Sequence, residues 1–341
     1  MSGYNVAILG ATGMVGQEFI KVLEQRRFPM TRVSLLASDR SAGHMIKVKG
    51  QELEVKEATS DSFRGIDIAL FSAGADISRK FSPIAAEQGA VVIDNSAAFR
   101  MEKDVPLVVP EVNPGDIKKH QGIIANPNCA TIQMVVVLYP LHKVSRVKRI
   151  IVTTFQSVSG TGLTAVDELM AQTRQILEGK RATHNVYPHQ IAFNVFPEID
   201  VFLDDDYTKE ERKTVEETRK IMHDAKIAIS STCVRVPILR GHSEAITVEF
   251  EKPMSAIEAR NILSKAAGVI VMDEPQKSFY PQPVIAADTD EVYVGRIRKD
   301  TSSENGLVMW VVADNVRKGA ALNAVQIAEI VINQNLIPNR K

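Results

Sequence analysis

The sequence contains only two cysteines in 341 residues, Cys129 and Cys233. Their spacing forms neither a metal-binding motif nor a disulfide framework, so we expect no metal site and a reducing compartment. No secretory signal is recognisable at the N-terminus, which makes the cytoplasm the expected location. No apolar run approaches the roughly 20 residues of a membrane-spanning helix, so we expect no membrane partner.

The chain also lacks net charge, because 41 basic residues balance 41 acidic ones. Bulk charge therefore favours neither nucleic acid nor a membrane surface as a partner, although it does not exclude a local anion pocket. Repeats and low-complexity tracts are absent as well. What the chain does have is length and apolar content: 45% of its residues are hydrophobic, enough for two domains with sizeable cores.

The start of the chain combines a strand, a glycine-rich turn and a helix. Residues 4–9 read as a buried strand, Gly10, Gly13 and Gly16 follow, and a helical pattern runs through Leu23. In a dinucleotide-binding unit the first glycine permits a tight turn, the second lets main-chain N–H groups approach a pyrophosphate, and the third permits close helix–strand packing. The spacing is G-x-x-G-x-x-G and not the common G-x-G-x-x-G, so a glycine-rich turn without a ligand is the alternative.

The end of the second predicted strand, residues 33–37, is where the adenosine ribose of a bound dinucleotide lies. NAD-binding units usually place an acidic residue there, whereas here Ser38 comes first, followed by Asp39, Arg40 and Ser41. A guanidinium and two hydroxyls can hold a 2′-phosphate, which favours NADP. Asp39 points instead toward NAD, and a solvated loop charge is the alternative for Arg40.

Two further buried strands are predicted at residues 67–71 and 90–94, with a helix at 78–88 between them. Ligands of doubly wound sheets collect beyond the carboxyl ends of such strands. The residues found there are Ser72, Gly74, Asn95, Ser96 and Arg100. Arg100 is thus a candidate anion ligand, although a lone arginine after a strand is more often a surface charge.

Cys129 lies in the stretch Asn-Pro-Asn-Cys-Ala-Thr, residues 126–131. Apolar runs at 122–125 and 132–141 flank it, which predicts a buried strand, a tight turn and a helix that begins at or near the cysteine. A helix N-terminus lowers the pKa of a thiol, and the thiolate is the nucleophilic form. The alternative is a buried, inert cysteine, which is the commoner fate of a lone one.

The composition changes after Arg149 to long alternating strands and amphipathic helices. The strands are predicted at 150–158, 228–238, 245–251, 291–298 and 307–313, and the helices at 163–177, 209–223 and 257–267. The fold class is therefore α/β: a Rossmann-type doubly wound sheet followed by an α+β domain with an antiparallel or mixed sheet. A last amphipathic helix, 320–333, is of a kind that often returns to the first domain.

A thiol nucleophile together with a nicotinamide cofactor indicates aldehyde or acyl-group redox chemistry. Such a site needs a base near the thiol, and the sequence offers seven histidines. His242 is the candidate, because Gly241 and Ser243 flank it and a strand follows. Most lone histidines are solvated or structural, so this assignment needs further support.

Over nearly its whole length the chain resembles the shorter bacterial branch of aspartate-β-semialdehyde dehydrogenase. The ordered set of matching stretches is 10–16, 95–100, 126–131, Gln156 with 159–162, 217–220, 235–237 with 241–243, and 314–315 with 318–320. Ala97 departs from the family, in which many members have a second serine there. We expect little effect, because Ser96 remains.

The resemblance implies roles for the matching residues. Cys129 is the nucleophile, His242 is the acid/base that takes the thiol proton and later serves the oxyanion, and Gln156 orients the substrate or a water. The implied substrate-binding residues are Arg235 for the carboxylate, Glu217 for the ammonium, Lys220 and Arg100 for phosphate, and Asn128, which shapes the site. The expected cofactor-binding residues are Gly10, Thr12, Gly13, Met14, Val15, Ser38, Arg40, Ser41, Ser72, Gly74, Asn95, Ser159, Gly160 and Asn315, the last at the nicotinamide. A solvated helix salt bridge is the alternative for Glu217 and Lys220.

The implied reaction is NADPH-dependent reductive dephosphorylation of L-aspartyl-4-phosphate to L-aspartate 4-semialdehyde and phosphate, through an acyl thioester on Cys129. It would serve the biosynthesis of lysine, through diaminopimelate, and of threonine, methionine and isoleucine. The implied organisation is a dinucleotide-binding domain, 1–128, to which the C-terminal segment 320–341 returns. A catalytic and dimerisation domain of the glyceraldehyde-3-phosphate-dehydrogenase-like kind, 129–319, would complete a homodimer or homotetramer.

Two other functions compete with this one. N-acetyl-γ-glutamyl-phosphate reductase shares the architecture and the cysteine chemistry, but its substrate has an acylated amine that would leave Glu217 without an ammonium partner. A non-catalytic protein that merely retained the fold is the second, and the joint presence of Cys129, Gln156, Arg235 and His242 argues against it.

Overall fold

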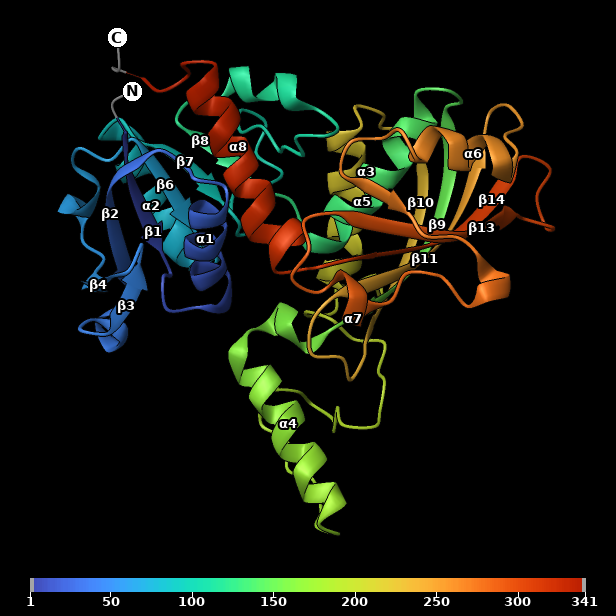
Figure 1. The fold of residues 1–341 in the computed structure, drawn as a ribbon, viewed down its shortest axis with the longest axis horizontal. Coiled ribbons are helices and arrows are strands. Elements are labelled where there is room, and N and C mark those ends of the chain that lie inside the picture. The colour runs from blue at the N-terminus through green and yellow to red at the C-terminus, as the bar shows by residue number, and fades with distance from the viewer. Residues whose placement is uncertain (1–2, 339–341) are drawn as a thin grey trace. The chain divides into compact units, whose positions relative to one another are not determined.

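The computed structural model describes residues 3–338. The chain divides into two compact units, and each is coloured by position along the chain in Figure 1. The first unit comprises the residues through Asn128 and those from Ala320 onward, and the second comprises residues 129–319. In the described part of the chain, no helix combines the length and the apolar content needed to cross a membrane.

The first unit contains a six-stranded parallel sheet in the order β5-β2-β1-β6-β7-β8. Its strands are β1 (Tyr4–Leu9), β2 (Met30–Ala37), β5 (Lys56–Glu57), β6 (Ile68–Phe71), β7 (Val91–Asp94) and β8 (Ile123–Ala125). This is the Rossmann order, in which the direction of winding reverses between β1 and β6. Strands β6 and β7 are buried at every residue, as expected of parallel strands with both faces covered. The predicted doubly wound sheet is confirmed.

Helices cover both faces of this sheet. Helices α1 (Met14–Gln25) and α8 (Leu322–Asn333) contact one another and share a core with inward residues such as Phe19 and Val325. Helix α2 (Ala75–Glu87) belongs to the other core, with Phe81 and Ala85. The C-terminal helix therefore completes the first unit, although it follows the second in sequence.

One hairpin of the first unit was missed by the sequence analysis. Strands β3 (Met45–Val48) and β4 (Gln51–Glu54) pair antiparallel and are visible as a small projection in Figure 1. The two residues that join them, Lys49 and Gly50, both have positive φ, 48° and 81°. That is the backbone of a tight hairpin turn, but lysine is not one of the residues that signal it.

The second unit contains a six-stranded mixed sheet in the order β10-β9-β11-β14-β13-β12. Its strands are β9 (Val147–Gln156), β10 (Ala228–Arg235), β11 (His242–Phe250), β12 (Val269–Val271), β13 (Val292–Lys299) and β14 (Gly306–Ala313). The β9–β10 and β12–β13 pairs are parallel and the other pairs are antiparallel. The predicted α+β organisation with a mixed sheet is confirmed.

Helices α3 (Cys129–His142), α5 (Lys209–Ile221) and α6 (Ala256–Leu263) contact one another or this sheet. Helix α4 (Leu163–Leu177) instead extends away from the sheet (Figure 1) and packs with the loop after it around Leu169, Tyr187 and Ile191. The short elements of the two units are α7 (Pro283–Ala286), the 3₁₀ helices Asp39–Ser41, Ser60–Phe63, Pro114–Lys119, Val158–Thr161 and Pro275–Lys277, and a π-helix, Arg317–Ala321.

Candidate active site

One edge of the second sheet collects several of the predicted residues. Gln156 ends β9 and Arg235 ends β10, and the two pair directly in the parallel register. His242 begins β11, which runs antiparallel to β9, so it starts at the same edge. Asn315 follows β14, whose last residue, Ala313, pairs with His242. Four residues from distant parts of the sequence therefore meet at this edge.

Cys129 is the first residue of α3, as the sequence predicted. The next nine residues of the helix are buried, whereas Cys129 is partly exposed. A Cβ at Gly319 would lie 2.8 Å from the Cβ of Cys129, so only glycine fits beside the thiol-bearing residue. Helix α3 contacts β9, β11 and β14. The buried residues of α3 therefore hold Cys129 against the sheet that carries the other candidate site residues.

The second cysteine has a different environment. Cys233 is fully buried in β10, and burial raises the pKa of its thiol to about 12. A buried thiol that stays protonated is neither nucleophilic nor readily alkylated. The alternative of an inert buried cysteine therefore describes Cys233, while Cys129 is the accessible one.

His242 is almost completely buried, at 1% exposure, and its ring is held through Nδ1. The main-chain N–H of Ser157 donates to Nδ1 at 3.1 Å, and the Ser157 hydroxyl oxygen is also 3.1 Å away. Burial, and after it the cation of Arg235, lower the pKa of His242 to about 3, against the opposing effects of the Glu210 charge and the Gly241 carbonyl. The imidazole is therefore neutral near pH 7.

Asn315 is a buried anchor for the loops on either side of this histidine. Its Oδ1 accepts from the main-chain N–H of Gly241 at 2.9 Å and from the hydroxyls of Ser157 and Ser159 at 3.1 Å. Its Nδ2 donates to the Ser159 hydroxyl at 3.0 Å. The side chain of Asn315 therefore links the loop after β9 to the turn before β11. Its expected place at the nicotinamide stays a prediction.

Gln156 is fully buried, and a residue that the sequence analysis did not single out holds its amide. Its Nε2 donates to Oε1 of Glu210 on α5 at 3.1 Å. The other carboxylate oxygen of Glu210 is 3.1 Å from Lys213, which also reaches Asp200. Although burial alone would lower the pKa of Lys213, these carboxylates raise it. Within residues 3–338, Oε1 of Gln156 has no hydrogen-bond partner, so the amide presents a buried acceptor.

Arg235 is 5% exposed and is fixed on two sides. One terminal nitrogen donates to the Ser157 carbonyl at 2.6 Å, and the guanidinium lies 5.5 Å from the centre of the Tyr187 ring. Its Nε is buried without a hydrogen-bond partner in the described part of the chain. A Cβ at Gly160 would lie 3.4 Å from Nε2 of His242 and 3.5 Å from a terminal nitrogen of Arg235. The Gly160 main chain therefore borders both side chains.

Glu217 and Lys220 lie one turn apart on α5, as predicted. Glu217 is only 1% exposed, and Lys220 is partly exposed. Helix α5 contacts both β10 and α3, so its buried face, which includes Glu217, is turned into the second unit. A solvated surface salt bridge, the alternative considered for this pair, does not describe Glu217.

In the first unit, the glycine turn lies at the point where the sheet reverses its winding. Gly10 has φ of 87°, and a Cβ there would come 2.2 Å from the carbonyl oxygen of Ser72, which follows β6. A Cβ at Gly16 would come 2.1 Å from the Gly10 carbonyl oxygen. Gly13 occupies the N-cap position of α1, where no side chain caps the helix and its first turn has no acidic residue. The main-chain N–H groups at the start of α1 therefore suit a dinucleotide phosphate.

The segment after β2 forms a 3₁₀ turn, Asp39–Ser41, preceded by Ser38. Arg40 is exposed, and the carboxylate of Asp39 accepts the main-chain N–H of Arg40 at 2.8 Å. The Asp39 carboxylate is thus engaged with the main chain of the next residue.

Arg100 is not a surface charge in the structure, because it is 8% exposed. Its guanidinium donates to the main-chain oxygens of Asn95 at 2.7 Å and Asn126 at 3.0 Å, which follow β7 and β8. The side chains of Asn95 and Asn126 are also bonded, at 2.6 Å. Arg100 therefore fixes the backbone that leads to Asn128, itself only 6% exposed.

Comparison with known proteins identifies the family. Residues 5–120 match the family model described as semialdehyde dehydrogenase, NAD binding domain, and residues 138–318 match semialdehyde dehydrogenase, dimerisation domain. The aspartate-semialdehyde dehydrogenase of Aquifex aeolicus (strain VF5) is 57% identical over 98% of this chain and 100% of its own. The chain belongs to the aspartate-semialdehyde dehydrogenase family.

Solved structures of aspartate-semialdehyde dehydrogenases have the same fold. Aspartate semialdehyde dehydrogenase II from Vibrio cholerae, complexed with ASA, superposes with a TM-score of 0.95 at 48% identity, covering 98% of this chain and 99% of that one. The enzyme from Candida albicans, solved with NADP, has a TM-score of 0.77 at 28% identity, covering 98% and 100%. Membership places this chain among the oxidoreductases of amino-acid biosynthesis, with an NAD(P)-binding domain and a domain through which subunits associate.

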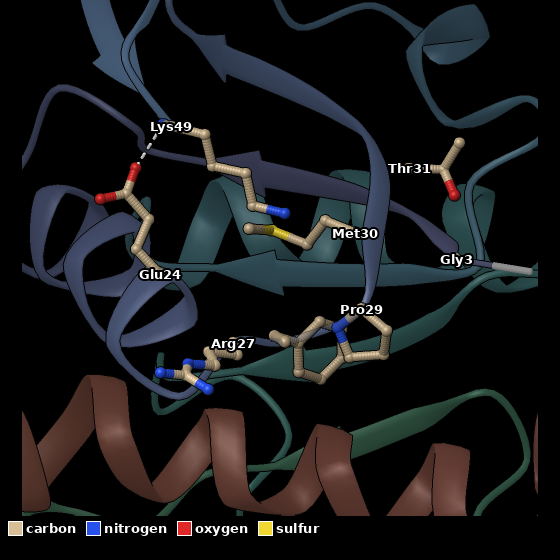
Figure 2. A pocket seen from close by; sticks show the side chains of 8 residues that line it. Gly3, Glu24, Arg27, Pro29, Met30, Thr31 and Lys49 are labelled. Atoms are coloured by element: carbon tan, nitrogen blue, oxygen red, sulfur yellow. Dashed lines mark hydrogen bonds between the residues drawn. The ribbon is translucent and has the colours of Figure 1, made fainter. Parts of the chain in front are cut away.

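A surface hollow of about 570 Å³ in this aspartate-semialdehyde dehydrogenase family member lies away from the predicted cofactor residues. Figure 2 shows Glu24, Arg27 and Lys49 around it, with Glu24 accepting the main-chain N–H of Lys49. It is also lined by Gly3 and Met30, which lie at the amino ends of β1 and β2. Ligands of this fold bind beyond the opposite, carboxyl ends, where Gly10 lies.

Proposed function

We propose that this protein catalyses the NADPH-dependent reductive dephosphorylation of L-aspartyl-4-phosphate to L-aspartate 4-semialdehyde and phosphate, in the cytoplasm. The observation that carries the proposal is the edge of the second sheet. Gln156, Arg235 and His242 meet there, and the partly exposed Cys129 begins the helix packed on that sheet. A homodimer or homotetramer is the proposed assembly.

Cys129 acts as the nucleophile in this proposal. Its thiolate attacks the acyl carbon, a C–S bond forms, and the C–O bond to phosphate breaks, which leaves an acyl thioester on the enzyme. Bound NADPH would supply the hydride that reduces the thioester to a thiohemiacetal. The thiohemiacetal oxygen then re-forms the carbonyl and expels the Cys129 thiolate, so the enzyme returns to its starting state.

The substrate's charged groups would meet complementary residues. Arg235 offers a planar guanidinium whose buried Nε has no partner in the described residues, and a carboxylate is the acceptor that such a fork fits. Glu217, buried on α5, is the proposed partner of the substrate ammonium. Lys220 and Arg100 are the proposed phosphate ligands, and Asn128 shapes the site beside Cys129.

NADP is the proposed cofactor, bound through the glycine turn of the first unit and the residues after its strands. Gly13 leaves the start of α1 without a side-chain cap, which supports a bound pyrophosphate. Ser38, Arg40 and Ser41 would hold the 2′-phosphate, and the competing Asp39 carboxylate already accepts from the main-chain N–H of Arg40. The other proposed cofactor contacts are those of Gly10, Thr12, Met14, Val15, Ser72, Gly74, Asn95, Ser159, Gly160 and Asn315.

Replacing Arg40 tests the cofactor assignment. We expect Arg40→Ala to lower kcat/KM with NADP by about 10- to 100-fold, the range for charge-assisted hydrogen bonds, while kcat/KM with NAD stays the same. The matched control is Arg32→Ala, which removes another exposed cation, near the amino end of β2. An unchanged NADP/NAD ratio in Arg40→Ala, measured by steady-state kinetics, would reject the 2′-phosphate role.

Glu210 offers a test of the site's architecture. We expect Glu210→Ala to lower kcat by about 10-fold, since the amide of Gln156 loses the charged acceptor that sets its orientation. Glu216→Ala, an exposed glutamate on the same helix, should leave kcat unchanged. Thermal melting of both variants shows whether a lower kcat comes from a displaced Gln156 amide or from a loss of folded protein. Equal kcat values for the two folded variants would contradict this role for Glu210.

The substrate assignment is tested by comparing two aldehydes with NADP and phosphate. L-Aspartate 4-semialdehyde should be oxidised with the higher kcat/KM, and N-acetyl-L-glutamate 5-semialdehyde should be poor, since its acylated amine cannot pair with Glu217. A preference for the N-acetylated aldehyde would replace the proposal with N-acetyl-γ-glutamyl-phosphate reductase, which the full-length similarity to aspartate-semialdehyde dehydrogenases does not favour.

A further inference from the structure

Two buried polar side chains of the second unit have no part in the proposed chemistry. Glu244 on β11 and Gln133 on α3 are each 1% exposed. Among residues 3–338, neither the two carboxyl oxygens of Glu244 nor Oε1 and Nε2 of Gln133 make a hydrogen bond of normal geometry. Buried polar groups of native proteins are nearly always paired, so these four atoms need an explanation.

The two side chains are neighbours. Glu244 faces the interior together with Ile246 and Val248, and α3, which packs on this sheet, contacts β11. Burial raises the pKa of Glu244 well above its usual range, and the amide of Gln133 opposes part of this rise. An amide acts on the ionisation of a carboxyl group through a hydrogen bond, so the two groups lie within reach of each other.

We propose that Gln133 and Glu244 form a reciprocal acid–amide pair that holds α3 on β11, and that these two are positioning residues for Cys129 and His242. The consequence for catalysis rests on the proposed function. The pair itself does not, and it can be detected without substrate.

The hydrogen-bonding capacity of the two groups requires the acid form of Glu244. An ionised carboxylate only accepts, so it could take a hydrogen from Nε2 of Gln133 but would leave Oε1 of Gln133 without a donor. A protonated carboxyl group has one O–H donor and a carbonyl acceptor. It can donate to Oε1 and accept from Nε2 at the same time, which gives each of the four buried atoms one partner.

The surroundings of Glu244 also favour the neutral acid. Across the sheet it pairs with Thr154 on β9 and Val311 on β14, which carry no charge. Of the titratable side chains, His242 lies two residues before it on β11, and Cys233 lies beyond Thr154 on β10. His242 is neutral and Cys233 is protonated near pH 7. Within residues 3–338 no cation contributes to the pKa of Glu244, so a carboxylate there would lose its hydration without a compensating charge.

The pair lies one step from the candidate active site on both elements. Cys129, the titratable residue of α3 nearest in sequence to Gln133, is four residues before it, so the two share a helix face one turn apart. His242 and Glu244 are two residues apart on β11 and share a strand face. One helical turn advances about 5.4 Å and two strand residues about 6.8 Å. A bond between Gln133 and Glu244 therefore fixes α3 to β11 close to the residues that carry the thiol and the imidazole.

The first test needs no turnover. At pH 7, the infrared difference spectrum between the unmodified full-length enzyme and Glu244→Gln should contain the C=O band of one un-ionised carboxyl group, which the variant lacks. Glu249→Gln is the control, because Glu249 lies on the partly exposed face of the same strand. It should leave this band in place. A spectrum of the unmodified enzyme without the band would overturn the pair.

Stability gives a second signature, and its sign is fixed. The unfolded chain releases the proton of Glu244 above about pH 4, whereas the native state keeps it, so this group lowers the stability of the native state as the pH rises. Glu244→Gln has no such proton. Its Tm relative to that of the unmodified enzyme should therefore rise between about pH 5 and about pH 8. A difference in Tm that stays constant over this range would contradict a protonated Glu244.

Turnover separates a positioning role from packing alone. Glu244→Ala should lower the kcat of the folded enzyme by about 10- to 100-fold with KM changed by only a few-fold, since a small displacement of α3 misplaces the nucleophile. Glu244→Gln should keep most of kcat, because two amides can form the same reciprocal pair. Gln133→Ala should lower kcat as much as Glu244→Ala, and the double variant should lower it no further. Val248→Ala, which removes buried packing further along β11, should lower Tm but not the kcat of the folded fraction.

Two results would overturn the positioning role: an equal loss of kcat in Glu244→Gln and Glu244→Ala, or equal kcat values in Glu244→Ala and Val248→Ala. Both are comparisons between variants of an active enzyme. A failure of the proposed function would instead leave the unmodified enzyme without activity on L-aspartate 4-semialdehyde. The infrared band and the pH dependence of Tm would still report on the pair in that case.

Discussion

Cys129→Ala is expected to lower kcat/KM by at least about 10⁴-fold, a loss typical of removing a catalytic nucleophile. Without the thiolate there is no thioester, and the hydride has no acyl acceptor on the enzyme. NADP binding should survive, because the glycine turn lies in the first unit and Cys129 in the second. Steady-state kinetics and isothermal titration with NADP measure the two properties on the same sample.

The matched control for Cys129 is the second cysteine. Cys233→Ala, in the sheet interior, should retain catalysis in whatever fraction of the protein folds. Iodoacetamide should alkylate one thiol per native chain, at Cys129, and the second only after unfolding, since burial raises the pKa of Cys233 to about 12. Near-normal turnover in Cys129→Ala, or alkylation of Cys233 first, would refute the assignment of the nucleophile.

His242→Asn is expected to lower kcat by about 10²- to 10³-fold, the range for removing a general acid/base or an oxyanion-stabilising group, with KM changed by only a few-fold. The asparagine side chain can still form hydrogen bonds with the two Ser157 groups that contact Nδ1 of His242. It is too short to place a nitrogen where Nε2 lies. The expected loss therefore falls on the chemical steps and not on substrate binding.

His223→Asn is the control for this substitution, because His223 is an exposed histidine in the same unit. Its left-handed backbone, with φ of 54°, is one that asparagine tolerates. It should leave kcat unchanged. A result in which His242→Asn raises KM strongly while kcat stays normal would make His242 a binding residue and not a catalytic one.

The regular elements could be predicted from sequence because their signals are local. β1 and α4 begin and end at the predicted residues, Tyr4–Leu9 and Leu163–Leu177, since apolar periodicity and flanking glycines mark them. The hairpin β3–β4 escaped prediction because its strands are short and mostly exposed and its turn begins with Lys49. Such a hairpin leaves little apolar pattern to detect.

The sequence predicted which residues form the site, but it did not predict the hydrogen bonds that orient them. Cys129 stood out by its place between a strand and a helix and His242 by its flanking residues, and the family resemblance brought out Gln156 and Arg235. The bonds that orient them join residues far apart in sequence: Ser157 and His242 are 85 positions apart, and Ser157 and Asn315 are 158 apart. These pairs arise from the register of β9, β11 and β14, which no local pattern specifies.

The most direct test of the central claim follows NADPH absorbance after L-aspartate 4-semialdehyde and NADP are mixed with the enzyme in the absence of phosphate. If Cys129 carries an acyl thioester, a burst of about one NADPH per active site should appear and then stop, because no acceptor removes the acyl group. Adding phosphate should start sustained turnover. Steady turnover without phosphate, or no burst from enzyme that binds NADP, would contradict the account.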